Sequence, residues 1–137
     1  MSVLALSPVS ASVYGVLNVA ALTALVTGVF DDVPQGTAFP YVWYVVDEEN
    51  ARGMGRGGMR QVNLRVHAVS SYEGQKELHT IMSKVIQLLE DTALTITGYQ
   101  AAGEVVYRET VAPFQSMIDE VQVRESVAQF TIWAEPS

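Results

Sequence analysis

One alternating stretch, residues 61–68 (QVNLRVHA), constrains the fold of this chain more than any other. Its apolar members occupy every second position, and polar residues lie between them. Successive side chains of a β-strand point to opposite faces, so the pattern predicts a strand with one buried face and one wet face. The buried face carries Val62, Leu64, Val66 and Ala68, and the wet face carries Gln61, Asn63, Arg65 and His67.

Three further segments have strand character. Residues 41–46 form a β-branched and aromatic run, which predicts a strand buried on both faces and ended by the acidic residues 47–49. Residues 105–114 and 121–133 predict two more strands around a turn at residues 115–120. The first two strands and the loop between them form a long hairpin.

The clearest helix covers about four turns and begins near Leu78. Apolar residues recur along it at helical spacing, and polar residues fill the opposite face, which is typical of an amphipathic helix on a core. The apolar positions are Leu78, Ile81, Met82, Val85, Leu88 and Leu89.

Two shorter helical segments precede the strands. Ser10 or Ser12 can cap the first, and Asn18, a good capping residue, can begin a second at about residues 19–26. Gly28 lies where a helix closes with a left-handed residue. We therefore predict an α+β fold, with N-terminal helices and a four-stranded, mainly antiparallel sheet on which one long amphipathic helix packs. The 137 residues suit a single domain, residues 1–137.

The residue types needed for catalysis or metal binding are scarce. The absence of cysteine excludes thiolate zinc sites and a thiol nucleophile, and two histidines do not favour a histidine metal site. Asp31 and Asp32 lack a calcium-loop continuation, and no serine lies in a Gly-x-Ser-x-Gly elbow. His67 is interpreted as a strand-surface histidine and His79 as a boundary residue of the long helix. We expect no enzyme activity, no metal and no cofactor.

The net charge and the hydropathy of the chain limit the classes of partner that it can bind. The net charge of −7 argues against general polyanion binding, because the dominant electrostatic contribution would be repulsive. The apolar run at residues 13–30 contains polar residues and has no basic residue before it, so neither a signal peptide nor a membrane span is expected.

A glycine-rich segment, residues 50–61 (NARGMGRGGMRQ), matches the dinucleotide pattern G-x-G-x-x-G. That pattern binds pyrophosphate at the start of a helix, whereas here a strand pattern follows, so a nucleotide site is not favoured. An arginine–glycine segment that binds single-stranded nucleic acid is a weaker alternative, because no aromatic residue lies within it. A solvated hairpin tip and a loop that orders against a protein partner both stay open. The candidate partner-interface residues are Arg52, Met54, Arg56, Met59 and Arg60.

The segment VFDDVPQGTAFPYV, residues 29–42, carries a family resemblance. It resembles the signature of the tail-completion, or tail-terminator, family of long non-contractile-tailed phages and related gene-transfer particles. The likeness continues through residues 62–70 and 72–74 and ends at residues 127–133, so it covers nearly the whole chain. The signature positions, taken as structural, are Asp32, Val33, Pro34, Gln35, Phe39, Pro40 and Tyr41.

The resemblance implies a structural virion protein. Such a protein assembles as a homohexameric ring on the head-proximal end of a tail tube, stops tube polymerisation and presents a surface to the head-completion (stopper) protein. Genomic DNA passes through the ring without sequence-specific binding. The resemblance implies no catalysis and no cofactor, and it places the protein in the tail or neck of a virion assembled in the host cytoplasm. Another neck component, such as a connector protein, and a nucleic-acid-binding protein that uses the glycine loop are the alternatives.

Overall fold

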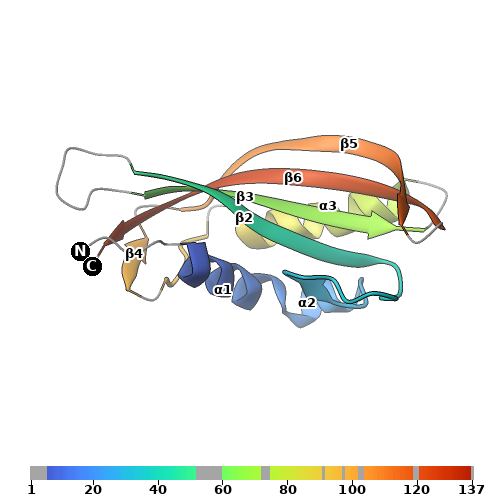
Figure 1. Cartoon of the computed structure of the whole chain (residues 1–137), viewed down its shortest axis with the longest axis horizontal. Helices are drawn as coiled ribbons and strands as arrows, with labels where there is room; N and C mark the ends of the chain where they lie inside the picture. The colour runs from blue at the N-terminus through green and yellow to red at the C-terminus, as the bar shows by residue number, and fades with distance from the viewer. Residues whose placement is uncertain are drawn as a thin grey trace.

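Helices cover one face of a long, curved sheet in the computed structural model of the chain (Figure 1). The structure describes residues 6–51, 60–71, 75–90, 92–96, 98–101, 104–118 and 121–136. Its helices are α1 (Leu6–Leu17), α2 (Ala20–Thr23) and α3 (Lys76–Leu89). Its strands are β1 (Val29–Phe30), β2 (Tyr41–Ala51), β3 (Arg60–Ser70), β4 (Tyr99–Ala101), β5 (Val106–Ile118) and β6 (Val121–Pro136).

The strand order is β1-β2-β3-β6, with β4 and β5 both paired to the outer edge of β6. β3 occupies the other edge of β6, since Ala134 pairs with both Arg60 and Ala101. β1 runs parallel to β2, and the remaining pairs are antiparallel. The α+β class and the mainly antiparallel sheet are confirmed. The predicted count of four strands is wrong, because the described sheet also contains the short strands β1 and β4.

The main core lies between this sheet and the helices. α3 packs over β3 and β6, and α1 packs over β2 and β1. The predicted apolar face of β3 is fully buried at all four positions, and all but one of the predicted apolar positions of the long helix are buried too. Leu88 is the partly buried one and packs against the core. Both patterns are therefore confirmed as core-forming.

The N-terminal helices begin and end at other residues than predicted. α1 is already helical at Leu6, so Ser10 and Ser12 lie inside it and cap nothing. The Asn18 N–H still bonds to the Tyr14 carbonyl at 2.8 Å and thus ends α1. The N-cap of the four-residue α2 is Val19, in extended conformation and without a side-chain cap bond.

Gly28 does not close a helix. Its φ is not positive, and its carbonyl accepts the Val42 N–H at 3.1 Å, which brings the chain into the sheet beside β2. A Cβ at this position would lie 2.7 Å from Cζ of Phe30. The glycine therefore makes room for the Phe30 ring.

The hairpins are longer than the sequence pattern indicates. Pairing of β2 with β3 continues to Ala51↔Arg60, and a register shift between Val46 and Glu48 keeps the acidic run inside the strand. Pairing of β5 with β6 continues to Ile118↔Val121, so the turn predicted at residues 115–120 is wrong over residues 115–118. Cross-strand contacts stabilise these extensions where no apolar alternation reveals them; Gln122 Nε2, for example, donates to Gln115 Oε1 at 2.7 Å.

The central position of β3 gives a test of this packing. Leu64→Ala should lower the free energy of unfolding by about 2–5 kcal/mol, because Leu64 is fully buried between α3 and the sheet and its loss leaves a cavity. Urea denaturation followed by circular dichroism measures the change. Gln87→Ala, on the exposed face of α3, is the control and should change stability by less than about 0.5 kcal/mol. Equal effects of the two substitutions would contradict this core.

Candidate interaction surfaces

The segment between β1 and β2, residues 31–40, is called the signature loop below. It folds toward the sheet face opposite the helices. There Tyr41, Val69 and Val123 form a second buried cluster, against which Val33 and Phe39 of the loop and Ile118 of β5 pack. The ring of Phe39 stacks on that of Tyr41, with centroids 5.5 Å apart and planes 20° apart. The loop thus covers one end of the helix-free face.

Threonines hold the loop in this position. Thr27 Oγ1 donates to the Ala38 carbonyl at 2.7 Å, and the Thr27 N–H donates to the Pro40 carbonyl at 2.8 Å. Thr37 Oγ1 donates to the Pro34 carbonyl at 2.6 Å. Gly36 has a φ of +82°, which favours glycine, and the Phe39–Pro40 peptide bond is cis.

The signature residues therefore divide into two groups. Val33, Phe39 and Tyr41 contribute to the second cluster, and Pro40 shapes the entry into β2. Asp32, Pro34 and Gln35 are exposed. Pro34 and Gln35 line a shallow hollow with Ile118. The inner group explains the apolar spacing of the signature as a folding requirement, and the outer group is available for contacts with other molecules.

A histidine–carboxylate pair lies on the helix-free face, beside the second buried cluster. His67 Nδ1 is 2.8 Å from Glu125 Oε2, and the His67 ring stacks on Trp43 with centroids 3.8 Å apart and planes 14° apart. Only 8% of His67 is exposed, so its interpretation as a surface histidine on a wet face is wrong. Its neighbours bury it, and Glu125 lies 58 residues away in sequence, where local periodicity gives no signal.

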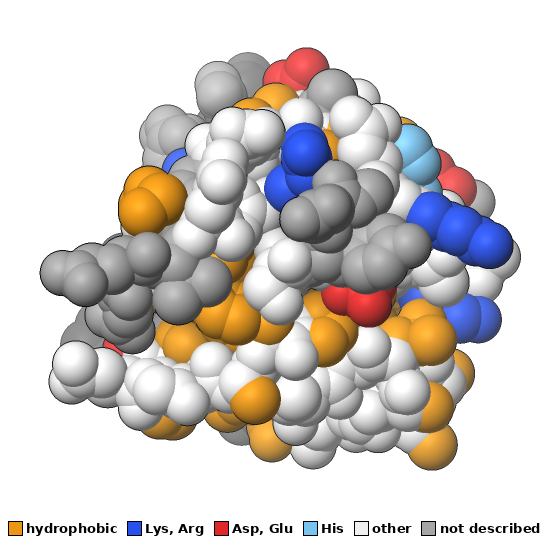
Figure 2. Space-filling view, turned by 90° about the vertical axis from the view of Figure 1, so that its right-hand side faces the viewer, with side chains coloured by type: hydrophobic (Ala, Val, Ile, Leu, Met, Phe, Trp, Pro, Cys, Tyr) orange, Lys and Arg blue, Asp and Glu red, His pale blue; other side chains and the backbone are white. Residues whose placement is uncertain are grey.

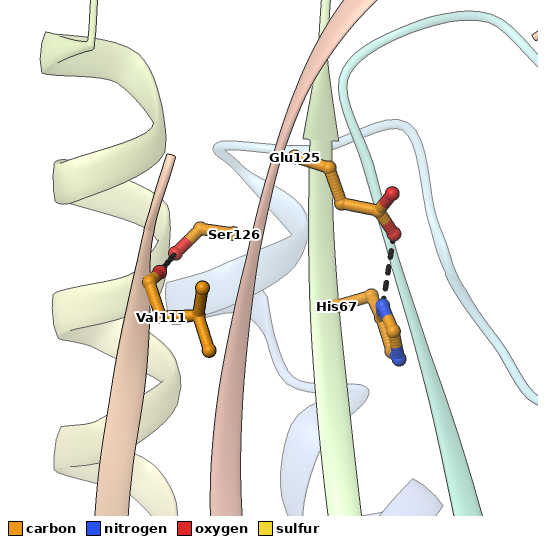
Figure 3. Close-up of polar contacts among 4 residues, drawn as sticks. All are labelled: His67, Val111, Glu125 and Ser126. Atoms are coloured by element: carbon orange, nitrogen blue, oxygen red, sulfur yellow. Dashed lines mark hydrogen bonds and ion pairs between the residues drawn. The ribbon is translucent and has the colours of Figure 1, made fainter. Parts of the chain in front are cut away.

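Ser126 does not act as a nucleophile partner of this histidine–carboxylate pair. Ser126 follows Glu125 directly but points to the other side of β6, where its Oγ donates to the Val111 carbonyl at 2.8 Å (Figure 3). Adjacent strand residues point to opposite faces, which separates Ser126 from His67. Within the described ranges, no cluster of three His, Asp or Glu side chains is arranged to hold a metal ion.

Most of the glycine-rich segment lies outside the residues that the structure describes. Arg52, Met54, Arg56 and Met59 lie outside the described residues, and of Arg60 the structure shows the backbone, which begins β3. A strand follows the segment, as predicted, so the helix start that the dinucleotide pattern requires is not there.

Apolar side chains that the sequence analysis did not single out are exposed on the edge strand β5. Val111, Phe114 and Met117 all lie outside the core, and Met117 is 64% exposed. Near the opposite edge of the sheet, α1 and β1 border a hollow lined by Ala11, Tyr14 and Phe30, among others. Figure 2 shows hydrophobic side chains spread over the lower half of one end of the molecule, with Lys and Arg side chains mainly above them. The sequence signals these surfaces weakly: Tyr14 lies within an expected helix, and Pro113 lies near the end of an expected strand.

The inner signature residues can be tested directly. Phe39→Ala should destabilise the fold by about 1–2 kcal/mol, because it removes the ring that stacks on Tyr41 and part of the cover of the second cluster. Gln35→Ala, in the same loop and exposed, should have no measurable effect on stability. Thermal unfolding of the two variants measures the difference, and a Phe39→Ala variant as stable as the parent would contradict a structural role of the signature.

The comparison with solved structures finds the same fold in a chain of a virion particle and in a bacteriophage protein. A chain from the structure titled "Virion of native gene transfer agent (GTA) particle" superposes with a TM-score of 0.82, covers 98% of this chain and 99% of its own length, and is 20% identical. The structure of bacteriophage SPP1 gp17 protein superposes with a TM-score of 0.58 over 92% of this chain and 87% of its own, at 15% identity. The search of curated proteins gives no match.

Sequence comparison with protein families is more specific. The family described as tail completion protein gp17 matches residues 12–135, which include every described strand except the last residue of β6, the helices α2 and α3, and the second half of α1. The resemblance seen in residues 29–42 is thereby confirmed. The chain belongs to the tail completion protein gp17 family, and its role is that of a structural tail-completion protein.

Proposed function

We propose that six copies of this chain form a ring on the head-proximal end of a tail tube, where the ring stops polymerisation of the tube and joins the tail to the head. The observation that carries the proposal is the family match over residues 12–135. The similarity of nearly the whole chain to a component of a gene-transfer-agent virion supports the same role. The partners are the tail tube protein on one rim and the head-completion (stopper) protein on the other.

The charge of the chain is compatible with a conduit for DNA. Six copies at −7 each give a ring of about −42, whose field is screened within about 8–10 Å at physiological salt. A wall of this sign does not hold the passing duplex by its phosphates. None of the described helices is long and apolar enough to span a bilayer. We place the protein in the tail or neck of a virion that assembles in the host cytoplasm.

The ring and its effect on the tube give the first test. Purified protein should form hexamers, alone or on tube ends, and should shorten the tubes that tube protein forms by itself, because each ring blocks an end. Mass photometry measures the stoichiometry, and negative-stain electron microscopy measures tube length and shows where the rings sit. The Leu64→Ala variant, if unfolded, serves as a control for non-specific effects of added protein.

Two outcomes of this test are informative, and disruption of the gene gives a separate check. Monomers that leave tube length unchanged would refute the proposal. Rings found on head portals and not on tube ends would favour another neck component, such as a connector protein. Disruption of the gene should give unjoined heads and abnormally long tails, whereas normal particles would exclude the role.

We further propose that the glycine-rich hairpin segment contacts a partner through Arg52, Arg56 and Arg60, with Met54 and Met59 adding apolar contacts. Arginine pairs well with carboxylates, and an acidic ring of this kind has few other cations to offer an acidic partner. The triple change to alanine should reduce head–tail joining by about tenfold, which corresponds to about 1.4 kcal/mol of lost contact energy.

The control for the triple variant has the same net charge but keeps the segment. Lys76, Lys84 and Arg124 are changed to alanine, and joining is counted by electron microscopy in extracts supplied with either protein. Equal joining by the two variants would show that the arginines are merely solvated. A large, salt-sensitive loss of nucleic-acid retention in the arginine variant alone would instead favour the nucleic-acid alternative.

A further inference from the structure

The two long edges of the sheet carry apolar surfaces of different shape. β5 lies at one edge, and β1 lies at the other, with α1 packed beside it (Figure 1). On β5 the apolar side chains protrude: Val111, Phe114 and Met117 are all exposed. Beside β1 the surface is hollow, with Ala11 and Tyr14 on one side and Val29 and Phe30 on the other.

The outer edge of β5 does not favour the addition of a further strand through backbone hydrogen bonds. Within the described strands, β5 pairs only with β6, so its outer edge could in principle accept another strand. However, Pro113 has no N–H to donate, and it lies within the register shift between Val111 and Phe114. A contact at this edge is therefore made mainly by side chains.

The register of β5 places these side chains around its edge. Phe114 pairs with Glu125, whose side chain is on the helix-free face with His67. Met117 pairs with Gln122, and Gln122 is three residues from Glu125 along β6. The side chains of Gln122 and Met117 therefore point to the opposite face of the sheet from Glu125 and Phe114. Phe114 and Met117 thus flank the edge, and the unbranched thioether of Met117 can adapt to an irregular surface.

The hollow between α1 and β1 offers a recess for an apolar side chain such as that of Met117. Its lining includes Tyr44, whose hydroxyl donates to the Ser10 carbonyl at 3.3 Å, and burial raises the pKa of that hydroxyl above its ordinary value. Tyr14 is 42% exposed at the rim, a large apolar ring left in water. Among the described residues of the lining, Asp31 is the one that carries a charge.

We propose that β5 of one copy docks through Phe114 and Met117 into the hollow between α1 and β1 of the next copy. The inference rests on the proposed ring and names the surface that closes it. A cyclic assembly needs two different patches on opposite sides of each subunit, and the two edges of this sheet provide them.

A second copy fits these patches better than another partner does. Copies that each carry −7 repel one another at long range, so a contact between them gains from uncharged groups. Val111, Phe114 and Met117 are uncharged, and the described lining of the hollow is mostly uncharged too. The protruding surface and the hollow occur on the same chain.

Cysteine cross-linking tests the contact while keeping Phe114 and Met117 unchanged. The chain contains no cysteine, so Ala11→Cys and Gln115→Cys together introduce the only two thiols, one at the hollow and one between Phe114 and Met117. A short bis-maleimide reagent should link assembled copies into a ladder that extends to six chains on a denaturing gel. The matched control is Ser83→Cys with Gln115→Cys, which places the first thiol on the exposed face of α3 and should give no ladder beyond dimers.

The outcomes separate this inference from the proposed function. Rings seen by mass photometry that give no ladder, or a control pair that gives the same ladder, would overturn the docking of β5 and leave the ring intact. If neither the double-cysteine protein nor the parent forms a ring, even with tube protein, both the docking of β5 and the proposed function are overturned. A ladder that extends to six chains, together with rings, supports both the docking of β5 and the proposed function.

A substitution gives an independent readout. Met117→Asp should lower the fraction of chains in rings at least tenfold, since it places a carboxylate in the hollow beside Asp31. Gln87→Asp, which makes the same change in charge on the outer face of α3, should leave the ring fraction within about twofold of the parent. Both variants should keep the parent's thermal stability, and equal ring fractions would overturn the inference.

Discussion

The pairing of β3 with β6, from Arg60↔Ala134 to Ser70↔Arg124, is the interaction on which the rest of this structure depends. It places two continuous sets of alternating side chains side by side. One set, with Leu64 and Phe130, is buried under the helices. The other set, with His67 and Glu125, builds the opposite face. A shift of one residue in this register would exchange the two faces, so the pairing fixes both the core and the interaction surfaces.

The second buried cluster gives the family signature a physical meaning. Val33 and Phe39 cover the end of the helix-free face, and Thr27 holds the loop from outside the signature. The loop joins β2, through Tyr41, to the end of β5, through Ile118. It therefore connects one half of the sheet to the strand that we propose as a contact between copies. The residue pattern that identifies the family therefore packs, in this chain, between the start of β2 and the end of β5.

Much of this arrangement could be predicted from sequence, for identifiable reasons. The alternation around Leu64 and the helical spacing around Val85 are strong because the face of each element that packs on the main core is apolar throughout. The strands β1 and β4 could not be predicted, since two or three residues show no period. The capping role predicted for Asn18 is wrong because α2 begins one residue later than that role requires, with Val19 as its N-cap.

The candidate surfaces were harder to predict than the core. The burial of His67 depends on Trp43 and Glu125, which come from two other strands, and no local pattern shows that they meet. The exposed apolar residues of β5 look like core residues in the sequence, because the pattern indicates a strand but not whether that strand lies at an edge. Three-dimensional neighbours decide both cases.

The position of β6 has a consequence for how the molecule comes into being. β6 is the last of the described strands in chain order, yet it pairs with β3, β4 and β5. During synthesis the earlier strands emerge without the strand that joins them, and most of the sheet forms only after its ladder with β6 can close. The hairpin of β5 with β6 forms at the same late stage. In the proposed ring, a nascent chain therefore lacks β5 in its paired form, and with it the proposed contact strand, until β6 has emerged.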